Sequence, residues 1–486
     1  MTSINSIFEE VLEDITPTKQ ELTLINDIII KLKKLIDEKA QELGINYTRI
    51  EPQGSTGIKQ TQLKNDFDID LFVGLNYELY KPKYASLSKN KLKKESKKDF
   101  RYLCDNWIIK SLNLKEFHNP RLLYAEHPYV TVDYIVESIS LKIDIVLFFD
   151  LGLEYIMNYG PVTAVDRSPW HGRFVKDNLS PKQKNDVRVL KQFFKANHSY
   201  GDKSAVGKVG FIGYSAELLI HHFGSLLNLF SNFSTLKDNP IDFHNRSINE
   251  LKNVQHFQND YIIITDPIDK NRNVASAISE KAYKYCNQRI KEFLDNPNKD
   301  YFLIENVPEI DLTTIDKSFV DKLFVIELKN ENTEIHYTIN RDKLYSIGDS
   351  IKANGEKEFS HAERFGRIEF EVYFEHDAEE YNLSIFCENP KIEKTYLRRG
   401  PPTKDKVHSE KFIQKNPTYF KKDGFLWIKS KRDYTLFMDF LTKFIRDKIP
   451  DNLKIINISN PPGAKTFSGK RCIYVLLNMV LPFTNN

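Results

Sequence analysis

The sequence is poor in cysteine, and it has no long apolar run. Only four of its 486 residues are cysteines, namely Cys104, Cys286, Cys387 and Cys472, and their wide separation gives no zinc-ligand or disulfide spacing. No stretch reaches the apolar length that spans a bilayer, and the polar N-terminus lacks the features of a secretory signal. These absences argue against a disulfide-rich secreted domain and a membrane protein, and they predict a protein of the reducing cytoplasm.

Excess charge is also scarce, except in one segment. The net charge is +3, with 41% apolar and 28% charged residues, as in ordinary globular proteins. The length indicates two to four domains. Between residues 391 and 432, however, 13 Lys and Arg accompany 4 Asp and Glu, a net of +9 that leaves −6 for the rest. A basic segment on a near-neutral chain indicates binding of a polyanion, although a solvated lysine face has the same composition.

The most informative stretch runs from Gly54-Ser55-Thr56-Gly57 to Asp68-Ile69-Asp70-Leu71. Apolar and acidic residues alternate over 67–74, which predicts a strand with Asp68 and Asp70 on one face. Neighbouring carboxylates repel each other unless a cation lies between them, and hard oxygen ligands favour Mg²⁺. The Gly-Ser turn can offer N–H groups and a hydroxyl to phosphate oxygens. Each motif alone is more often an ordinary turn or strand end, but together they indicate nucleotidyl transfer.

A third carboxylate strengthens this interpretation. Asp144 lies within the apolar run of residues 141–148, a predicted strand in which it faces away from Ile143 and Ile145. An acid in such a run is unfavourable without a partner. Three strand acids converging on two metal ions would form a two-metal site, in which one ion activates the attacking hydroxyl and the other steadies the leaving pyrophosphate.

Local patterns predict further elements around these acids. A capping box at Thr18 and Glu21 begins a helix that ends at Gly44. Other helices are expected over residues 86–111, around 187–194 and 214–223, and over 436–445. Strands are expected over residues 45–50, 129–135, 141–148, 322–328, 335–339, 367–374 and 383–387.

Several stretches together resemble the archaeal-type (class I) CCA-adding enzymes, tRNA nucleotidyltransferases of the polymerase β-like nucleotidyltransferase superfamily. The acidic strand alone is typical of the whole superfamily, whereas the later stretches are specific to this class. In chain order the matching stretches are Gly54-Ser55, Asp68-Ile69-Asp70, Tyr124-Ala125-Glu126-His127-Pro128-Tyr129-Val130, Ile143-Asp144-Ile145-Val146, Ala164-Val165-Asp166-Arg167-Ser168-Pro169-Trp170-His171, Val187-Arg188-Val189-Leu190-Lys191-Gln192-Phe193, Gly210-Phe211-Ile212-Gly213-Tyr214, Glu217-Leu218-Leu219, Asp266-Pro267, Arg272-Asn273-Val274-Ala275 and Gly400-Pro401-Pro402.

The resemblance implies an α+β fold and a set of site residues. A nucleotidyltransferase head with a mixed sheet would occupy residues 1–155, a helical neck 156–296, and an α/β body and tail that hold the tRNA acceptor stem 297–486. Asp68, Asp70 and Asp144 would carry Mg²⁺, and Asp144 would also help to deprotonate the tRNA 3′ hydroxyl. The residues implied to bind the nucleotide are Gly54, Ser55, Lys59, His171, Lys191, Tyr200 and Arg272, with Arg272 facing the base. In the basic segment, the residues expected to contact tRNA are Lys404, Lys406 and Lys411.

The chain departs from the family pattern near the Gly-Ser turn, where Ile58 replaces an arginine and Lys59 follows it. The implied activity is template-independent addition of C, C and A to tRNA from CTP and ATP. Two alternatives remain at this point: another superfamily enzyme that makes oligoadenylate or a cyclic nucleotide, and a non-catalytic RNA-binding relative. We expect no membrane partner, and the sequence leaves open whether the protein is a monomer or a homodimer.

Overall fold

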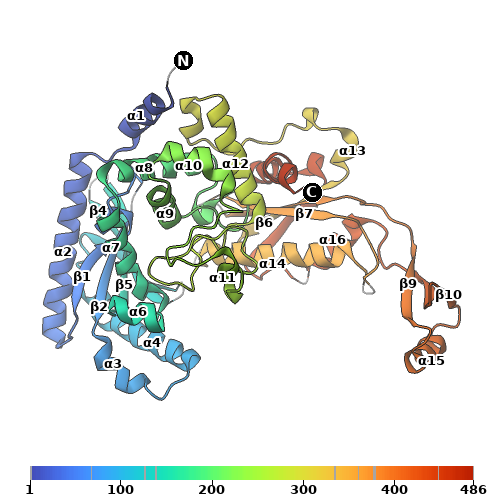
Figure 1. Ribbon diagram of the computed structural model, residues 1–486, viewed down its shortest axis with the longest axis horizontal. Helices are drawn as coiled ribbons and strands as arrows, with labels where there is room; N and C mark the ends of the chain where they lie inside the picture. Colours follow the sequence, from blue (N-terminus) through green and yellow to red (C-terminus); the bar gives the residue numbers. More distant parts are fainter. Residues whose placement is uncertain are drawn as a thin grey trace. The chain divides into compact units, whose positions relative to one another are not determined.

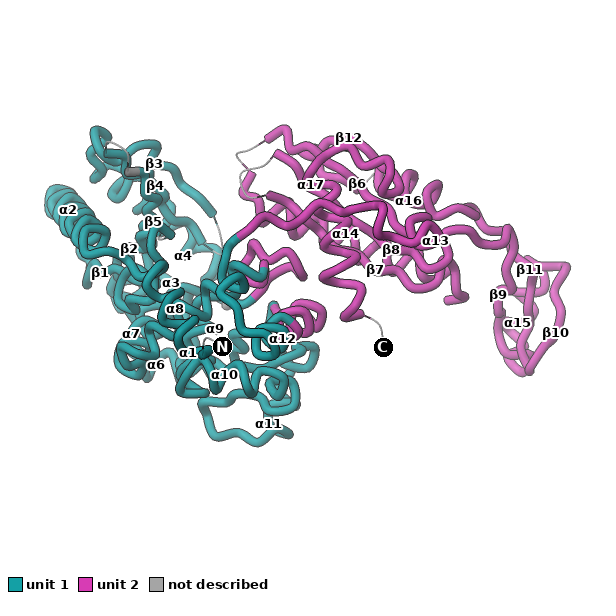
Figure 2. The backbone as a smooth tube through the Cα atoms, turned by 90° about the horizontal axis from the view of Figure 1, so that it is seen from above, with its two compact units in different colours: residues 1–197, 211–277, 289–304 teal, residues 198–210, 278–288, 305–486 magenta. Residues whose placement is uncertain are grey.

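The computed structural model describes residues 3–66, 68–124, 127–136, 139–332, 335–358, 361–375, 379–446 and 448–484. The chain forms two compact units (Figure 2). The first comprises residues 1–197, 211–277 and 289–304, and the second comprises residues 198–210, 278–288 and 305–486. Phe67, Ala125 and Glu126, which belong to predicted motifs, lie outside the described residues.

A five-stranded mixed sheet forms the centre of the first unit (Figure 1). Its strands are β1 (Arg49–Gln53), β2 (Ile69–Leu75), β3 (Phe117–Tyr124), β4 (Pro128–Val136) and β5 (Ile139–Phe149), in the spatial order β1-β2-β5-β4-β3. Only β2 and β5 run parallel to each other, whereas the other neighbours are antiparallel. The parallel pair places the acidic residues of both strands at the same level of the sheet, as described below.

One face of this sheet is apolar and buried. Leu71 and Val73 of β2 and Ile143 and Ile145 of β5 pack there against Leu32 and other apolar residues of a long helix, α2 (Lys19–Leu43). Further first-unit helices are α1 (Ile4–Ile15), α3 (Tyr77–Tyr84), α4 (Lys89–Leu103), α5 (Ile109–Ser111), α6 (Leu153–Tyr159), α7 (Ser168–Asn178), α8 (Pro181–Ala196), α9 (Gly213–Phe223), α10 (Leu226–Asn232) and α11 (Ile248–Lys252). Burial of one face leaves the acidic side chains on the opposite face, because strand side chains alternate.

Most predicted elements of the first unit are confirmed. The capping box at Thr18 and Glu21 is formed, and Gly44 ends α2 in the left-handed conformation. The predicted strand at 45–50 is misplaced: β1 begins at Arg49, because its position follows its pairing with β2, where Arg49 faces Gly74. The acidic strand begins at Ile69, so Asp68 lies just before it and is exposed.

The second unit is built around a four-stranded sheet with the order β12-β6-β8-β7. Its strands are β6 (Leu323–Asn330), β7 (Ile368–Phe374), β8 (Glu380–Cys387) and β12 (Leu453–Ser459), and its helices include α13 (Lys317–Val320), α14 (Tyr337–Glu356), α16 (Phe437–Arg446) and α17 (Phe467–Tyr474). Helix α12 (Glu280–Asp295) contributes residues to both units. The predicted strand at 335–339 is wrong, because α14 begins at Tyr337. Its buried residues, such as Leu344, Ile347 and Ile351, follow helical spacing.

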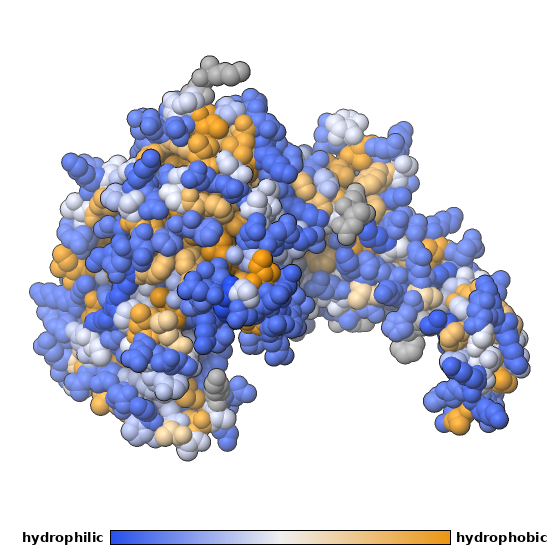
Figure 3. Space-filling view, in the orientation of Figure 1, coloured by the Kyte–Doolittle hydropathy of each residue, from blue (hydrophilic) through white to orange (hydrophobic). Residues whose placement is uncertain are grey.

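A smaller three-stranded sheet carries the basic segment. We call it the tail sheet: β9 (Thr395–Pro402), β10 (Phe420–Lys422) and β11 (Phe425–Lys431), in the order β10-β11-β9, with α15 (Lys406–Lys415) inserted between β9 and β10. The surface over these elements is largely hydrophilic in Figure 3. Lys404, Lys406 and Lys411 are all exposed. No helix among the described residues is long and apolar enough to cross a membrane.

Candidate active site

The parallel pairing of β2 and β5 sets two carboxylates side by side. Asp70 faces Asp144 across the strand pair, and Ile69 and Leu71 face Ile143 and Ile145. Burial, followed by the charges of Asp144 and Asp68, raises the pKa of Asp70 to about 7. Such a pair is unfavourable unless a cation neutralises it.

A cation would find a suitable ligand in Asp144. Lys142 Nζ lies 3.0 Å from Asp144 Oδ2, but Oδ1 is buried and accepts no hydrogen bond from the described residues. Within the described residues, no three His, Cys, Asp or Glu side chains lie close enough together to coordinate one metal ion. The two adjacent carboxylates of Asp70 and Asp144 are oxygen ligands of the kind that a divalent ion can share with substrate phosphates and water.

A turn at Gly54 lies against the carboxylate of Asp70. Gly54 directly follows β1 and has a φ of +67°, a left-handed value that favours glycine. A Cβ at this position would overlap the Asp70 carboxylate. Glycine therefore lets the backbone of the Gly54 loop, residues 54–62, approach the acids closely.

Helices α8 and α9 contact the Gly54 loop through Lys191 and the buried carboxylate of Glu217. Glu217 of α9 is 1% exposed and lies 2.6 Å from Lys59 Nζ, and it accepts a hydrogen bond from Thr61 Oγ1. Lys191 of α8 donates to the Thr61 carbonyl and hydroxyl, both at 3.0 Å, and lies 4.0 Å from Glu217. Burial lowers the pKa of Lys191 to about 8, although Glu217 opposes that shift. The loop is thus anchored by charged groups that are nearly inaccessible to solvent.

A second buried carboxylate organises the other side of the site. Asp266 Oδ2 lies 2.7 Å from His171 Nε2 and 2.8 Å from Arg272 Nη1, and Tyr214 donates to Oδ1 at 3.2 Å. Burial alone would raise the pKa of Asp266, but the His171 hydrogen bond and the Arg272 charge hold it well below its usual range. Burial also lowers the pKa of His171. Asp266 is therefore a buried anion with three side-chain donors.

Some of these groups line one cavity of about 550 Å³. Its walls are formed by Gln53, Gly54, Lys59, Asp70, Phe72, His127, Tyr129, Asp144, Val146, Ala164, Val165, Arg167, Ser168, His171, Tyr214 and Arg272. The cavity thus combines the carboxylates of Asp70 and Asp144 with the cationic or donor groups of Lys59, His171 and Arg272. That combination suits a molecule with a phosphate chain and a polar planar group.

The structure brings together only part of the predicted site. The predicted residues that line the cavity are Gly54, Lys59, Asp70, Asp144, His171 and Arg272. Ser55, Asp68 and Lys191 are not among its described lining residues, and Lys191 instead lies behind the Gly54 loop. Tyr200, Lys404, Lys406 and Lys411 belong to the second unit, and their roles stay predictions.

Sequence reasoning assigned no role to Glu217, Asp266 or Tyr214, although all three stand in the matching stretches. The apolar surroundings of the two acids in the sequence could have indicated that they are buried. Glu217 precedes Leu218 and Leu219, and Asp266 follows three isoleucines and a threonine, so each acid lies in an apolar run, as Asp144 does. A buried acid requires a partner, but the sequence does not say which.

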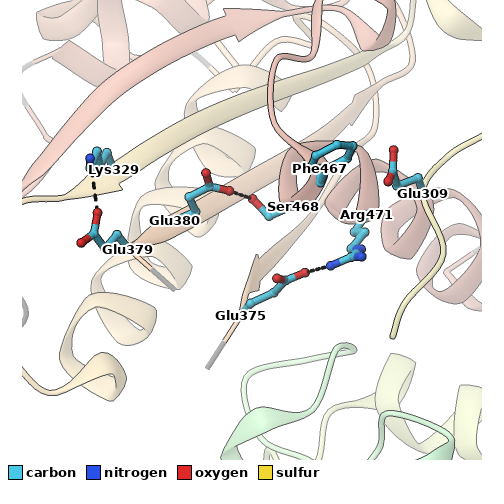
Figure 4. Close-up of a pocket in the computed structure, with 8 residues that line it drawn as sticks. All are labelled: Glu309, Lys329, Glu375, Glu379, Glu380, Phe467, Ser468 and Arg471. Carbon is cyan, nitrogen blue, oxygen red and sulfur yellow. Dashed lines mark hydrogen bonds and ion pairs between the residues drawn. The ribbon is translucent and has the colours of Figure 1, made fainter. Parts of the chain in front are cut away.

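A second cavity, of about 650 Å³, lies in the second unit (Figure 4). Its acids are largely paired: Glu379 lies 3.3 Å from Lys329, Glu375 pairs with Arg471, and Glu380 accepts a hydrogen bond from Ser468. Its described lining residues include no glycine and no acids paired on parallel strands. The first cavity is accordingly the better candidate for catalysis.

The sequence is similar to several known proteins. Residues 185–303 match the family model described as tRNA nucleotidyltransferase, second domain. The CCA-adding enzyme of Methanocaldococcus jannaschii is 27% identical and aligns with 95% of each chain, and that of Saccharolobus solfataricus is 29% identical over 88% of this chain and 89% of its own. The enzyme of Methanococcus maripaludis is 35% identical over 61% of each chain.

Among solved structures, a cytoplasmic RNA terminal U-transferase covers 63% of this chain and 99% of its own, with 12% identity and a TM-score of 0.45. The relatives that match along nearly the whole chain are CCA-adding enzymes, and the matching family model describes a tRNA nucleotidyltransferase. The chain is thus similar to archaeal CCA-adding enzymes along nearly its whole length, and to the second domain of tRNA nucleotidyltransferases over residues 185–303.

Proposed function

We propose that this enzyme adds C, C and A to the 3′ end of tRNA, without a nucleic-acid template, at the cavity in the first unit. The observation that carries the proposal is the register of Asp70 and Asp144 on parallel strands, with the Gly54 turn against Asp70. An aligned acidic pair beside a backbone turn and several cations suits transfer of a nucleotidyl group from a triphosphate. The location we propose is the cytoplasm, which suits four free and buried cysteines.

The acidic residues form the reaction end of the cavity. Asp70 and Asp144 hold Mg²⁺, and Asp68, exposed one residue before β2, completes the acidic set. Bound Mg²⁺ would activate the attacking hydroxyl and offset charge on the phosphates. Asp144 would also accept the proton of the tRNA 3′ hydroxyl, a role that rests on the family resemblance.

The triphosphate binds along the cationic side of the cavity. Lys59 stands beside the Gly54 turn and is anchored by Glu217, and it takes the place of the family arginine that Ile58 replaces. His171 donates or accepts a hydrogen bond through its remaining ring nitrogen, since Nε2 is engaged by Asp266. The family resemblance also implies triphosphate contacts for Ser55, Lys191 and Tyr200. Ser55 and Lys191 are not among the described lining residues of the cavity, and Tyr200 belongs to the second unit, so these three roles stay predictions.

Arg272 selects the base. Cytosine and adenine each present an unprotonated ring nitrogen beside an exocyclic amine, whereas uracil and guanine carry an N–H at that position. A guanidinium held in a fixed direction can donate to the first pair of bases and would face another donor in the second pair. A site built to donate one hydrogen bond discriminates strongly against a partner that cannot accept it.

A defined assay tests the proposal. A tRNA transcript that lacks CCA is incubated with CTP, with ATP, and with both, and the product ends are sequenced. We expect two C residues with CTP alone, no addition with ATP alone, and complete CCA ends with both. A run of A residues on any RNA would favour an oligoadenylate-forming enzyme, and unchanged ends in every reaction would favour a non-catalytic RNA-binding relative.

A further inference from the structure

Asp266 is the carboxylate that contacts Arg272, the residue proposed to select the base. We infer that Asp266 is a positioning residue, which fixes the guanidinium of Arg272 so that discrimination against UTP and GTP depends on both residues together. This inference rests on the proposed function, because it concerns the same cavity and the same nucleotides. Asp266 itself does not line the cavity among the described residues, so it acts through Arg272.

The geometry restrains Asp266 on every side. Its side chain is fully buried, and Oδ1 accepts hydrogen bonds from the Ile268 backbone N–H at 3.0 Å and from Tyr214 at 3.2 Å. Oδ2 is shared by His171 at 2.7 Å and Arg272 at 2.8 Å. A buried carboxylate with four donors cannot rotate without leaving several of them unpaired, which would be unfavourable.

The backbone joins Asp266 and Arg272 into one turn. The Asp266 N–H donates to the Arg272 carbonyl at 3.0 Å, and the Asp266 carbonyl accepts a hydrogen bond from His244 Nε2 at 2.8 Å. Asp266 and Arg272 are therefore the two ends of a turn that a backbone hydrogen bond closes. Their side chains form a second contact, the ion pair between carboxylate and guanidinium. This double connection restrains Arg272 more than a surface ion pair would.

Arg272 keeps donors for a ligand. Asp266 engages only Nη1, and the guanidinium forms no other hydrogen bond with the described residues. Its side chain is 29% exposed, against 0% for Asp266, and it lines the cavity. An arginine free to rotate could turn a different donor or none toward the base, and it would lose the directional contrast between a ring nitrogen and a ring N–H.

The test compares substrate preference in four full-length variants: Asp266→Asn, Arg272→Ala, their combination, and Asp242→Asn as a matched control. Asp242 is also a buried carboxylate, paired with Arg246 at 2.7 Å and bonded to Thr265, but it lies outside the cavity lining. For each variant we would measure kcat/KM for all four nucleoside triphosphates on tRNA lacking CCA or ending in CC. Binding of the four triphosphates would be followed by calorimetry, and folding by thermal melting.

We expect Asp266→Asn to reduce the preference for CTP over UTP, and for ATP over GTP, by about 10- to 100-fold, the range for one charged hydrogen bond. The double variant should be no less selective than Arg272→Ala, because the two residues act as a unit. Asp242→Asn should keep wild-type preference. Tyr214→Phe, which removes one donor without removing charge, should lower the preference by about 2- to 10-fold, and it replaces Asp266→Asn if that variant does not fold.

Two results would overturn the inference and are separable. A wild-type enzyme with no preference among the four nucleotides would refute the proposed function as well. Wild-type preference retained in Asp266→Asn, or in Tyr214→Phe if only that variant folds, would refute the positioning role alone. An equal loss for all four nucleotides together with a lower melting temperature would also refute it, because it would show only structural damage.

Discussion

At the scale of single residues, the site contains several buried carboxylates, and not all of them are paired with a cation. Glu217 and Asp266 are matched by cationic partners within hydrogen-bond reach. Asp70 is not, and its pKa is raised to about 7 by burial and by the neighbouring carboxylates. Asp70, which has no such partner among the described residues, marks the place where substrate and metal would supply the missing charge.

Replacing either strand acid should separate activity from stability. We expect Asp70→Asn or Asp144→Asn to reduce addition of both C and A by at least about 100-fold, because charge stabilisation of the transition state is lost. The melting temperature should stay the same or rise, since the substitution relieves repulsion between neighbouring carboxylates. Single-turnover assays and thermal melts measure the two effects, and near-wild-type turnover in either variant would refute the metal-binding role.

Lys191 should give the enzyme a specific pH dependence. Its pKa is about 8 in the folded protein against an unperturbed 10.5, so between these values the unfolded chain binds more protons at this site. The contribution of Lys191 to the free energy of unfolding should therefore rise with pH over that window.

Wild type is best compared with Lys191→Met, which keeps the length of the side chain but cannot titrate. The melting temperature of wild type relative to this variant should increase between pH 7 and pH 10. A difference that stays constant or shrinks with rising pH would mean that Lys191 does not titrate in this range, and that its amine is better solvated than the geometry indicates.

At the scale of elements, the Gly54 turn links β1 to the acids of β2. We expect Gly54→Ala to reduce activity at least about 10-fold, because a Cβ would overlap the Asp70 carboxylate and the backbone φ of +67° disfavours a side chain. Gly152→Ala is the control, since nothing lies within 4 Å of its Cβ position and its φ is −64°. Equal activity in both variants would show that the turn can relax away from the acids.

Elements with strong local signals could be predicted from the sequence, and contacts between distant segments could not. The capping box predicted α2, and the apolar run around Asp144 predicted β5. The five residues at 335–339 were too few to distinguish a strand from the first turn of α14. Gly400-Pro401-Pro402 lies in β9, an edge strand, where the missing N–H groups of the two prolines are tolerated.

In the candidate site too, residues with a local signal could be predicted, and contacts between distant segments could not. The strand acids follow from alternation within one segment, but the partners of Glu217 and Asp266 lie far along the chain. Lys59 and Glu217 are 158 positions apart, and His171 and Asp266 are 95 apart. Local patterns show that such acids are buried, and only the fold shows which cation meets each of them.

At the scale of the whole molecule, the protein has to hold many different tRNAs. The tail sheet and α15 carry much of the positive charge, and no ion pair joins Lys404, Lys406 or Lys411 to a carboxylate within the described residues. Because tRNA sequences differ, binding should depend on backbone and shape more than on base edges. This role of the tail remains a prediction.

Replacing these three lysines by alanine should weaken binding of two unrelated tRNAs equally and should flatten the dependence of affinity on salt, because fewer counterions are released. The control replaces Lys91, Lys93 and Lys94, three exposed lysines of α4, and so removes the same charge from the first unit. Affinities are measured at several salt concentrations. If both triple variants show the same slope as wild type, the tail lysines are only a solvated surface.

The most direct test of the whole account is a competition among nucleotides at the proposed site. Wild type and Asp144→Asn are given tRNA lacking CCA with all four nucleoside triphosphates at equal concentration, and every product end is sequenced. We predict that wild-type products extended to completion end in CCA and that Asp144→Asn leaves the tRNA unextended. Wild-type ends of mixed sequence, or CCA ends formed equally well by Asp144→Asn, would contradict it.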